Sequence, residues 1–272
     1  GLKNWKPENY GKKFYGPSTL RKGIEYSRNL MTIRIANILG LNKILDLSKK
    51  LNIYDDIPEL LSVSLGAAET SLINLTSAYA PFVNGGKKIE PNLISRIQDR
   101  RGKTIFNSKN RKCSGCDKFI NELDELPTIE NDFKQVISEE TAYQMTSILA
   151  GAVSRGTAKK LKSLGVPLAG KTGTTNNNFD AWFIGYSSNL VIGVYVGYDN
   201  PKTLGKYETG SKAALPIFKN FVENALFEED FEEFVIPENI FLTSLNYDTG
   251  QKSEEGDKKT IIEALKKKDI NN

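Results

Sequence analysis

The chain has 272 residues, of which 39% are hydrophobic, a length and composition that suit one large or two small domains with an ordinary core. Its 37 basic and 33 acidic residues give a net charge of +4, which is too small and too scattered to indicate a nucleic-acid partner. The chain contains no histidine. This excludes Ser-His-Asp and Cys-His catalysis and every metal site that depends on histidine.

The first third of the chain is predicted to be helical. Apolar residues recur at helical spacing over 19–39, and Gly40 is a natural stop. Short polar side chains in Ser27-Arg28-Asn29 are poor helix formers, so we expect a break there between two helices. Further helices are predicted over 42–51 and 71–83.

The middle of the chain carries a predicted hairpin over 93–106 and a polar insertion loop over about 107–135. The loop contains Cys113 and Cys116, a spacing that serves a local disulfide, a redox pair or half of a zinc site. Zinc needs two further ligands, and the chain offers no histidine and no third cysteine. We therefore favour a structural loop, closed by a disulfide, over a redox site, and we expect no metal.

The second half is predicted to hold the sheet. Ser138 is placed to cap a helix through Leu149, and strand-like runs from residue 168 onward indicate an antiparallel set. The apolar pattern of 215–227 predicts a helix that covers one face of this sheet. The segment 228–272 is charged and loosely patterned, which predicts a peripheral, partly disordered C-terminal extension.

The segment Lys171-Thr172-Gly173-Thr174 is the most informative for chemistry. It places a cation, small hydroxyls and a glycine on a predicted strand, whose edge offers backbone N–H groups to an anionic substrate. In a chain without histidine, a serine is activated by a lysine whose amine loses its proton in a desolvated cleft. Lys171 and Ser27 are the candidate cation and hydroxyl.

These segments resemble a known family. Ser27-Arg28-Asn29 and Lys171-Thr172-Gly173 look like the second and third motifs of the penicillin-binding proteins, whose set is Ser-x-x-Lys, Ser-x-Asn and Lys-Thr-Gly. The flanking segments are similar to the transpeptidase domain of the class A, bifunctional members: WKPENYGKKFYGPSTLRKGIEYSRN, SLGAAETSLINLTSAYAPFVNGG, SRGTAKKL and AGKTGTTNNNFDAWFIGY.

The resemblance covers most of the chain and implies its fold. We expect a mixed α/β protein, of α+β type, with the transpeptidase fold that penicillin-binding proteins share with serine β-lactamases. It would have a helical lobe and a partial antiparallel sheet. The partial transpeptidase domain would span 1–227 and the extension 228–272.

The resemblance also implies two catalytic roles. Ser27 would relay a proton between the nucleophile and Lys171. Lys171 would polarise that network and favour a carboxylate in the substrate.

Four further residues inherit substrate-binding roles. Asn29 would hydrogen-bond an amide of the donor peptide. Thr172 would bind the terminal carboxylate of a D-alanyl-D-alanine stem beside Gly173, and the backbone N–H of Thr174 would form half of an oxyanion hole.

The chain departs from the family in lacking a nucleophile. No serine is followed three positions later by lysine; the nearest match, Ser18-Thr19-Leu20-Arg21, ends in an arginine that cannot serve as a base. We therefore expect the chain to be part of a longer protein, with the Ser-x-x-Lys segment upstream of Gly1. Two strands that pair with the last strand of the sheet would also lie upstream, which predicts an open apolar edge over about 190–198.

The longer protein is thus expected to be a peptidoglycan D,D-transpeptidase, and the isolated chain to be inert. The alternatives are a D,D-carboxypeptidase or penicillin-hydrolysing relative, and a non-catalytic module that binds wall peptide. Implied partners are stem peptides, β-lactams and the upstream part of the polypeptide, with no cofactor, nucleic acid or metal. The implied location is the periplasmic face of the bacterial inner membrane, with the anchor upstream, because no apolar run here approaches the roughly 20 residues that span a bilayer.

Overall fold

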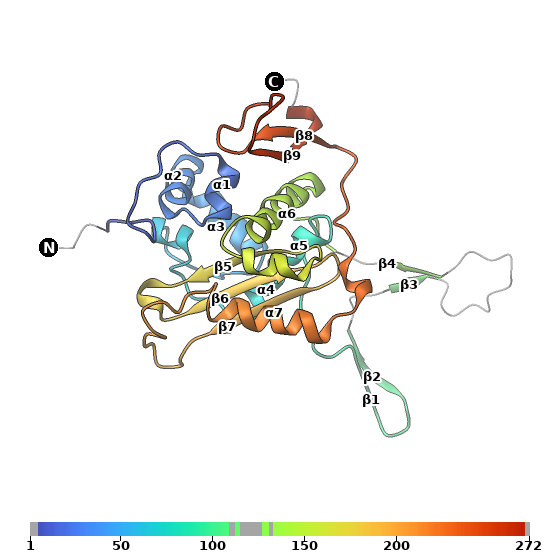
Figure 1. Cartoon of the computed structure of the whole chain (residues 1–272). Coiled ribbons are helices and arrows are strands. Elements are labelled where there is room, and N and C mark those ends of the chain that lie inside the picture. Colours follow the sequence, from blue (N-terminus) through green and yellow to red (C-terminus); the bar gives the residue numbers. More distant parts are fainter. Residues whose placement is uncertain (1–4, 109–111, 115–126, 131–132, 270–272) are drawn as a thin grey trace.

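The computed structural model describes residues 5–108, 112–114, 127–130 and 133–269 (Figure 1). A long helix, α6 (Glu139–Ser154), lies at the centre of the molecule, between a three-stranded sheet and a C-terminal hairpin. Shorter helices gather beside it near the N-terminus, and two small hairpins project from the other side. The mixed α/β architecture predicted from the sequence is confirmed.

The N-terminal helices follow the predicted pattern. They are α1 (Leu20–Glu25), α2 (Asn29–Leu39) and α3 (Leu41–Lys50). The predicted break falls between α1 and α2, where Ser27 has a φ of 53°. Gly40 separates α2 from α3 with a φ of 90°, a conformation that suits glycine because it has no Cβ. The break therefore projects Ser27 from a tight turn.

One predicted helix is wrong. In place of a single helix over 71–83, the chain forms α4 (Leu72–Ser77) and then α5 (Ala80–Val83), with the short 3-10 helix η1 (Leu61–Leu65) before them. The second residue of α5 is Pro81, which has no N–H to donate to the preceding turn. The helical hydrogen-bond ladder is interrupted there, and the chain turns.

The sheet has the strand order β5-β6-β7 and is antiparallel. Its strands are β5 (Ala169–Thr174), β6 (Ala181–Tyr186) and β7 (Val191–Val196). Within the described residues β7 pairs only with β6, which confirms the predicted open edge. At the opposite edge, β5 packs against α6. The edge that carries the Lys-Thr-Gly segment thus faces the helices.

Helices cover both faces of the sheet. On one face Phe183 meets Phe218 of α7 (Ala214–Ala225), and both rings are fully buried. On the other face Tyr186 is also fully buried and its hydroxyl lies 3.2 Å from Thr146 Oγ1 of α6. Alternating side chains of β6 therefore enter two separate cores, which fixes the register of the sheet.

Two hairpins project from the body. The first, β1 (Arg96–Gln98) with β2 (Thr104–Asn107), confirms the hairpin predicted over 93–106. The second pairs β3 (Lys112–Ser114) with β4 (Thr128–Glu130) in the predicted insertion loop. Cys113 is disulfide-bonded, and Cys116 lies outside the described residues.

The C-terminal segment contains an antiparallel hairpin, which we call the C-terminal hairpin, residues 240–266. It consists of β8 (Ile240–Asn246) and β9 (Thr260–Lys266), and it packs on α6 (Figure 1). Four short 3-10 helices complete the described elements: η2 (Lys159–Leu164), η3 (Asn176–Asn178), η4 (Glu228–Phe231) and η5 (Lys267–Asp269). The domain boundary placed at residue 228 stays a prediction. In the described part of the chain no helix is long and apolar enough to cross a bilayer.

Candidate active site

Ser27 and Lys171, 144 positions apart in sequence, meet in the structure. Lys171 Nζ donates a hydrogen bond of 2.8 Å to Ser27 Oγ, and a second of 2.9 Å to the backbone oxygen of Thr172. Ser27 comes from the turn between α1 and α2, whereas Lys171 comes from β5. The two residues singled out by the absence of histidine therefore form one contact across the boundary between the helices and the sheet.

The electrostatic setting of Lys171 suits proton transfer. Burial disfavours the charged ammonium and lowers the pKa of Lys171 from 10.5 to about 8. An amine with that pKa exchanges its proton close to neutral pH, whereas an ordinary lysine stays charged. Lys171 can therefore act either as a cation toward a carboxylate or as a proton carrier toward Ser27.

Next to this pair lies a pair of hydroxyls. Thr172 Oγ1 donates to Thr157 Oγ1 over 2.9 Å, and Thr157 follows the end of α6. The backbone N–H of Thr157 donates to the carbonyl oxygen of Glu25 over 3.1 Å. Because the hydroxyl of Thr157 is the acceptor in its bond with Thr172, its own O–H can donate a hydrogen bond to an anion. The structure thus adds Thr157 to the candidate binding residues that sequence reasoning had identified.

The remaining predicted residues are placed differently. The side-chain amide of Asn29 donates to the backbone oxygen of Glu8 over 2.9 Å, so the N-terminal segment holds its donor side. Gly173 pairs with Trp182 across the sheet. Thr174 is the last residue of β5, and its hydroxyl accepts the backbone N–H of Gly210 over 3.0 Å. Of the six predicted residues, the side chains of Ser27 and Lys171 are therefore directly bonded, whereas Asn29 is tied elsewhere.

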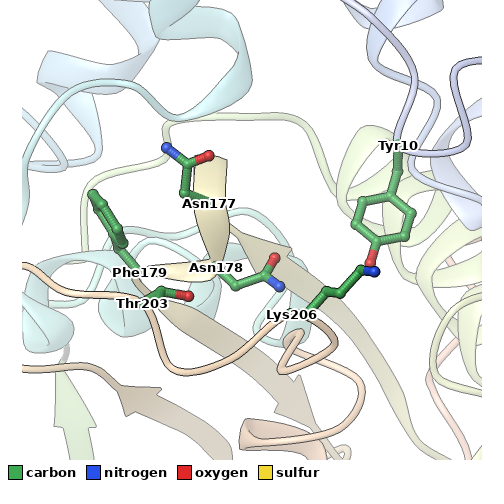
Figure 2. A pocket seen from close by; sticks show the side chains of 6 residues that line it. All are labelled: Tyr10, Asn177, Asn178, Phe179, Thr203 and Lys206. Carbon is green, nitrogen blue, oxygen red and sulfur yellow. The ribbon is translucent and has the colours of Figure 1, made fainter.

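A groove lies beyond the end of β5, at η3 (Asn176–Asn178). It is open, has a cavity volume of about 570 Å³, and is lined from three segments of the chain. Figure 2 shows its labelled side chains: Tyr10, Asn177, Asn178, Phe179, Thr203 and Lys206. Asn178 is buried and donates from its amide to the backbone oxygen of Gly205 over 2.8 Å, which ties two of these segments together. The lining of the groove includes none of the six predicted site residues.

Two signals for this site escaped the sequence reasoning. Thr157 lies in the SRGTAKKL segment, which carried the family resemblance without an assigned role. Glu25, fully buried two residues before Ser27, was hidden inside an ordinary helical pattern. A carboxylate in a buried helix position beside Ser-Arg-Asn is unusual, because such charges are buried only when paired. Among the described residues, no three His, Cys, Asp or Glu side chains gather where they could hold a metal ion.

The fold and this site place the chain among the transpeptidase domains of penicillin-binding proteins. The model of the penicillin binding protein transpeptidase domain matches residues 1–223. Penicillin-binding protein 1A of Rickettsia bellii (strain RML369-C) is 44% identical over 276 residues, covering 100% of this chain and 34% of that protein.

Solved structures agree. The crystal structure of penicillin-binding protein 1A from Haemophilus influenzae matches with a TM-score of 0.80 and 29% identity, over 95% of this chain and 42% of that one. PonA1 from Mycobacterium tuberculosis, solved with penicillin V, shares the fold with a TM-score of 0.67 and 22% identity, over 85% of this chain and 62% of that one. The chain belongs to the penicillin-binding protein transpeptidase family, as part of the transpeptidase domain of a class A member. It spans about a third of the length of the curated relatives it matches.

Proposed function

We propose that this chain forms the substrate-binding wall of a peptidoglycan D,D-transpeptidase whose nucleophilic serine lies outside the sequence. The observation that carries the proposal is the 2.8 Å hydrogen bond from Lys171 Nζ to Ser27 Oγ. It joins the two residues through which a histidine-free site can move a proton. The family membership supports the same reading, because penicillin-binding transpeptidases work through an acyl-serine.

The described side chains suit a substrate that ends in a carboxylate. Lys171 supplies the cation, and the hydrogen-bonded pair of Thr172 and Thr157, at the next position of β5, leaves the hydroxyl of Thr157 as a donor. Charge-assisted hydrogen bonds of this kind are roughly twice as strong as neutral ones. A D-alanyl-D-alanine terminus bound here would lie along β5, and its peptide would run toward the groove of Figure 2.

The proposed reaction is acyl transfer in two steps. In the first, a serine hydroxyl attacks the carbonyl carbon between the two D-alanines, and the C–N bond breaks. The serine proton passes to the departing amine through Ser27 and Lys171, and D-alanine leaves. In the second, the amine of a neighbouring stem peptide attacks the acyl-serine, the ester bond breaks, and the serine regains its proton. The side-chain oxygen of Asn29, whose amide N–H donates to the backbone oxygen of Glu8, would accept from the donor peptide, and the N–H of Thr174 would hold the oxyanion.

The proposal includes partners and a location. Stem peptides are the substrates, and β-lactams would acylate the same serine in their place. The reaction would take place at the periplasmic face of the inner membrane, and the membrane anchor would lie in another part of the polypeptide. No cofactor takes part, since a serine, a lysine and hydrogen-bond donors suffice for the chemistry.

Labelling with a fluorescent penicillin tests the proposal. We expect no covalent adduct with the 272-residue chain, and an adduct with a longer polypeptide that adds an upstream Ser-x-x-Lys. Lys171→Ala in the longer polypeptide should slow the labelling by about a hundredfold, as the loss of a general acid or base typically does. A covalent adduct on the 272-residue chain, abolished by mutating one of its own serines, would overturn the proposal.

A product assay on the longer polypeptide separates the enzyme classes. A transpeptidase forms a crosslinked dimer from stem peptides, whereas a D,D-carboxypeptidase or penicillin hydrolase releases only a hydrolysed product. A chain that merely binds wall peptide would give neither product. Release of D-alanine without any crosslink would reject the transpeptidase in favour of the hydrolytic alternative.

A further inference from the structure

A buried cluster of charges lies directly behind the Ser27 turn. Its centre is the carboxylate of Glu25, which has no exposed surface. Arg155 at the end of α6 donates to both carboxylate oxygens, over 2.5 and 3.2 Å. Arg21, itself 4% exposed, lies 3.5 Å from the same carboxylate. Burying a carboxylate is costly, so these partners are required to keep it in place.

The C-terminal hairpin supplies the remaining partner. The hydroxyl of Tyr247, just after β8, donates to Glu25 Oε2 over 2.7 Å. Glu263 of β9 pairs with Arg21, and Asp248 accepts a 2.6 Å hydrogen bond from Lys22 on α1. The hairpin is therefore attached to α1 by polar bonds, buried at Tyr247 and partly exposed at Asp248, although its residues are more than 200 positions away in sequence.

Glu25 links this cluster to both walls of the candidate site. It is the last residue of α1, two positions before Ser27. Its carbonyl oxygen accepts the N–H of Thr157, whose hydroxyl accepts the hydrogen bond from Thr172. The backbones of Glu25 and Gly156 are closely packed here, because a Cβ on Gly156 would lie 2.2 Å from the same carbonyl oxygen. A displacement of Glu25 would therefore reach the serine turn and the β5 strand together.

We propose that the C-terminal hairpin positions the candidate active site, with Tyr247 as a positioning residue that acts on Ser27 and Lys171 through Glu25. The hairpin, expected from the sequence to be peripheral, then belongs to the machinery of the site. This inference rests on the proposed function for the meaning of the site, but the geometry it predicts is testable without any reaction.

The test is side-chain NMR of Lys171 in the 272-residue chain, with its signal identified by its loss in Lys171→Met. Tyr247→Phe removes one hydroxyl and leaves the ring. We expect it to shift the Lys171 signal, and to weaken binding of a D-Ala-D-Ala peptide by roughly three- to tenfold, the range set by the loss of one ordinary hydrogen bond. Tyr195→Phe is the matched control. It removes a tyrosine hydroxyl on β7, which donates to the carboxylate of Asp180 over 2.8 Å. It should leave both readouts unchanged.

The outcomes distinguish positioning from simple stabilisation. If the hairpin only stabilises the fold, Tyr247→Phe lowers the melting temperature and leaves the Lys171 signal unchanged. That result would overturn the inference. If the variant does not fold, Glu263→Gln, which loosens the hairpin and keeps Tyr247, takes its place under the same criterion. If the unmutated chain binds no peptide, the proposed function fails, while the NMR shift still decides the positioning.

Discussion

Replacing Lys171 by methionine should make the chain more stable at neutral pH while destroying the site. Burial lowers the pKa of Lys171 from 10.5 to about 8, so the folded chain holds an ammonium in a setting that disfavours its charge. Methionine keeps most of the length and apolar stem of lysine and removes the ammonium. A residue that lowers stability where it stands is commonly kept for function.

The magnitude follows from linkage. The pKa of Lys171 falls from 10.5 in the unfolded chain to about 8 in the folded chain. At about 1.4 kcal/mol per pKa unit, this fall destabilises the folded chain by roughly 3 kcal/mol at pH 7. Methionine also loses the hydrogen bonds of 2.8 and 2.9 Å, which contribute roughly 1 kcal/mol each. We therefore expect Lys171→Met to raise the free energy of unfolding by about 1 kcal/mol at pH 7.

The pH dependence gives a sharper signature. Between pH 8 and 10.5 the unfolded chain binds a proton at Lys171 that the folded chain has lost, so the wild type gains stability with rising pH and the advantage of Lys171→Met shrinks. Urea unfolding at pH 7 and pH 10 measures this difference. Lys160→Met, at an exposed position, is the control and should show no such change. Parallel pH profiles for wild type and Lys171→Met would refute the reasoning.

Three further substitutions test other parts of the structure. Glu25→Leu should cost about 3–5 kcal/mol in urea unfolding, because the buried Arg21 and the partly exposed Arg155 would both lose this carboxylate. A cost below 1 kcal/mol would contradict the role of the cluster. Thr157→Val keeps the shape of the side chain and removes the hydroxyl that Thr172 contacts. Calorimetry should show that the peptide affinity falls about tenfold while the stability is almost unchanged. An unchanged affinity would exclude Thr157 from the site. Gly185→Ala would place a Cβ 2.7 Å from Phe218, and overpacking should lower stability by about 1–3 kcal/mol; a neutral result would mean that the ring can move.

Local signals predicted most of the fold. Ser138 caps α6 by accepting the N–H of Thr141, as its position before two glutamates indicated. The α6 helix runs to Ser154, beyond the predicted end at Leu149, because its last turn is buried against the rest of the structure. The helix predicted over 71–83 breaks between Ser77 and Ala80, just before Pro81, a residue whose effect can be read from the sequence.

The site was only partly predictable, for a physical reason. Ser27 and Lys171 were found because the absence of histidine left few ways to activate a serine. Thr157 and Tyr247 act through contacts between segments that are distant in sequence, and no local pattern reports such contacts. The paired charges around Glu25 become visible only when burial is known.

Calorimetric titration of the 272-residue chain with a D-Ala-D-Ala peptide tests the central claim most directly. If Lys171 and Thr172 form a carboxylate-binding wall, the chain binds the peptide saturably without a nucleophile. Binding is then lost in Lys171→Ala and in a peptide amidated at its C-terminus. Binding that is absent from the unmutated chain, or that survives both changes, would contradict the account.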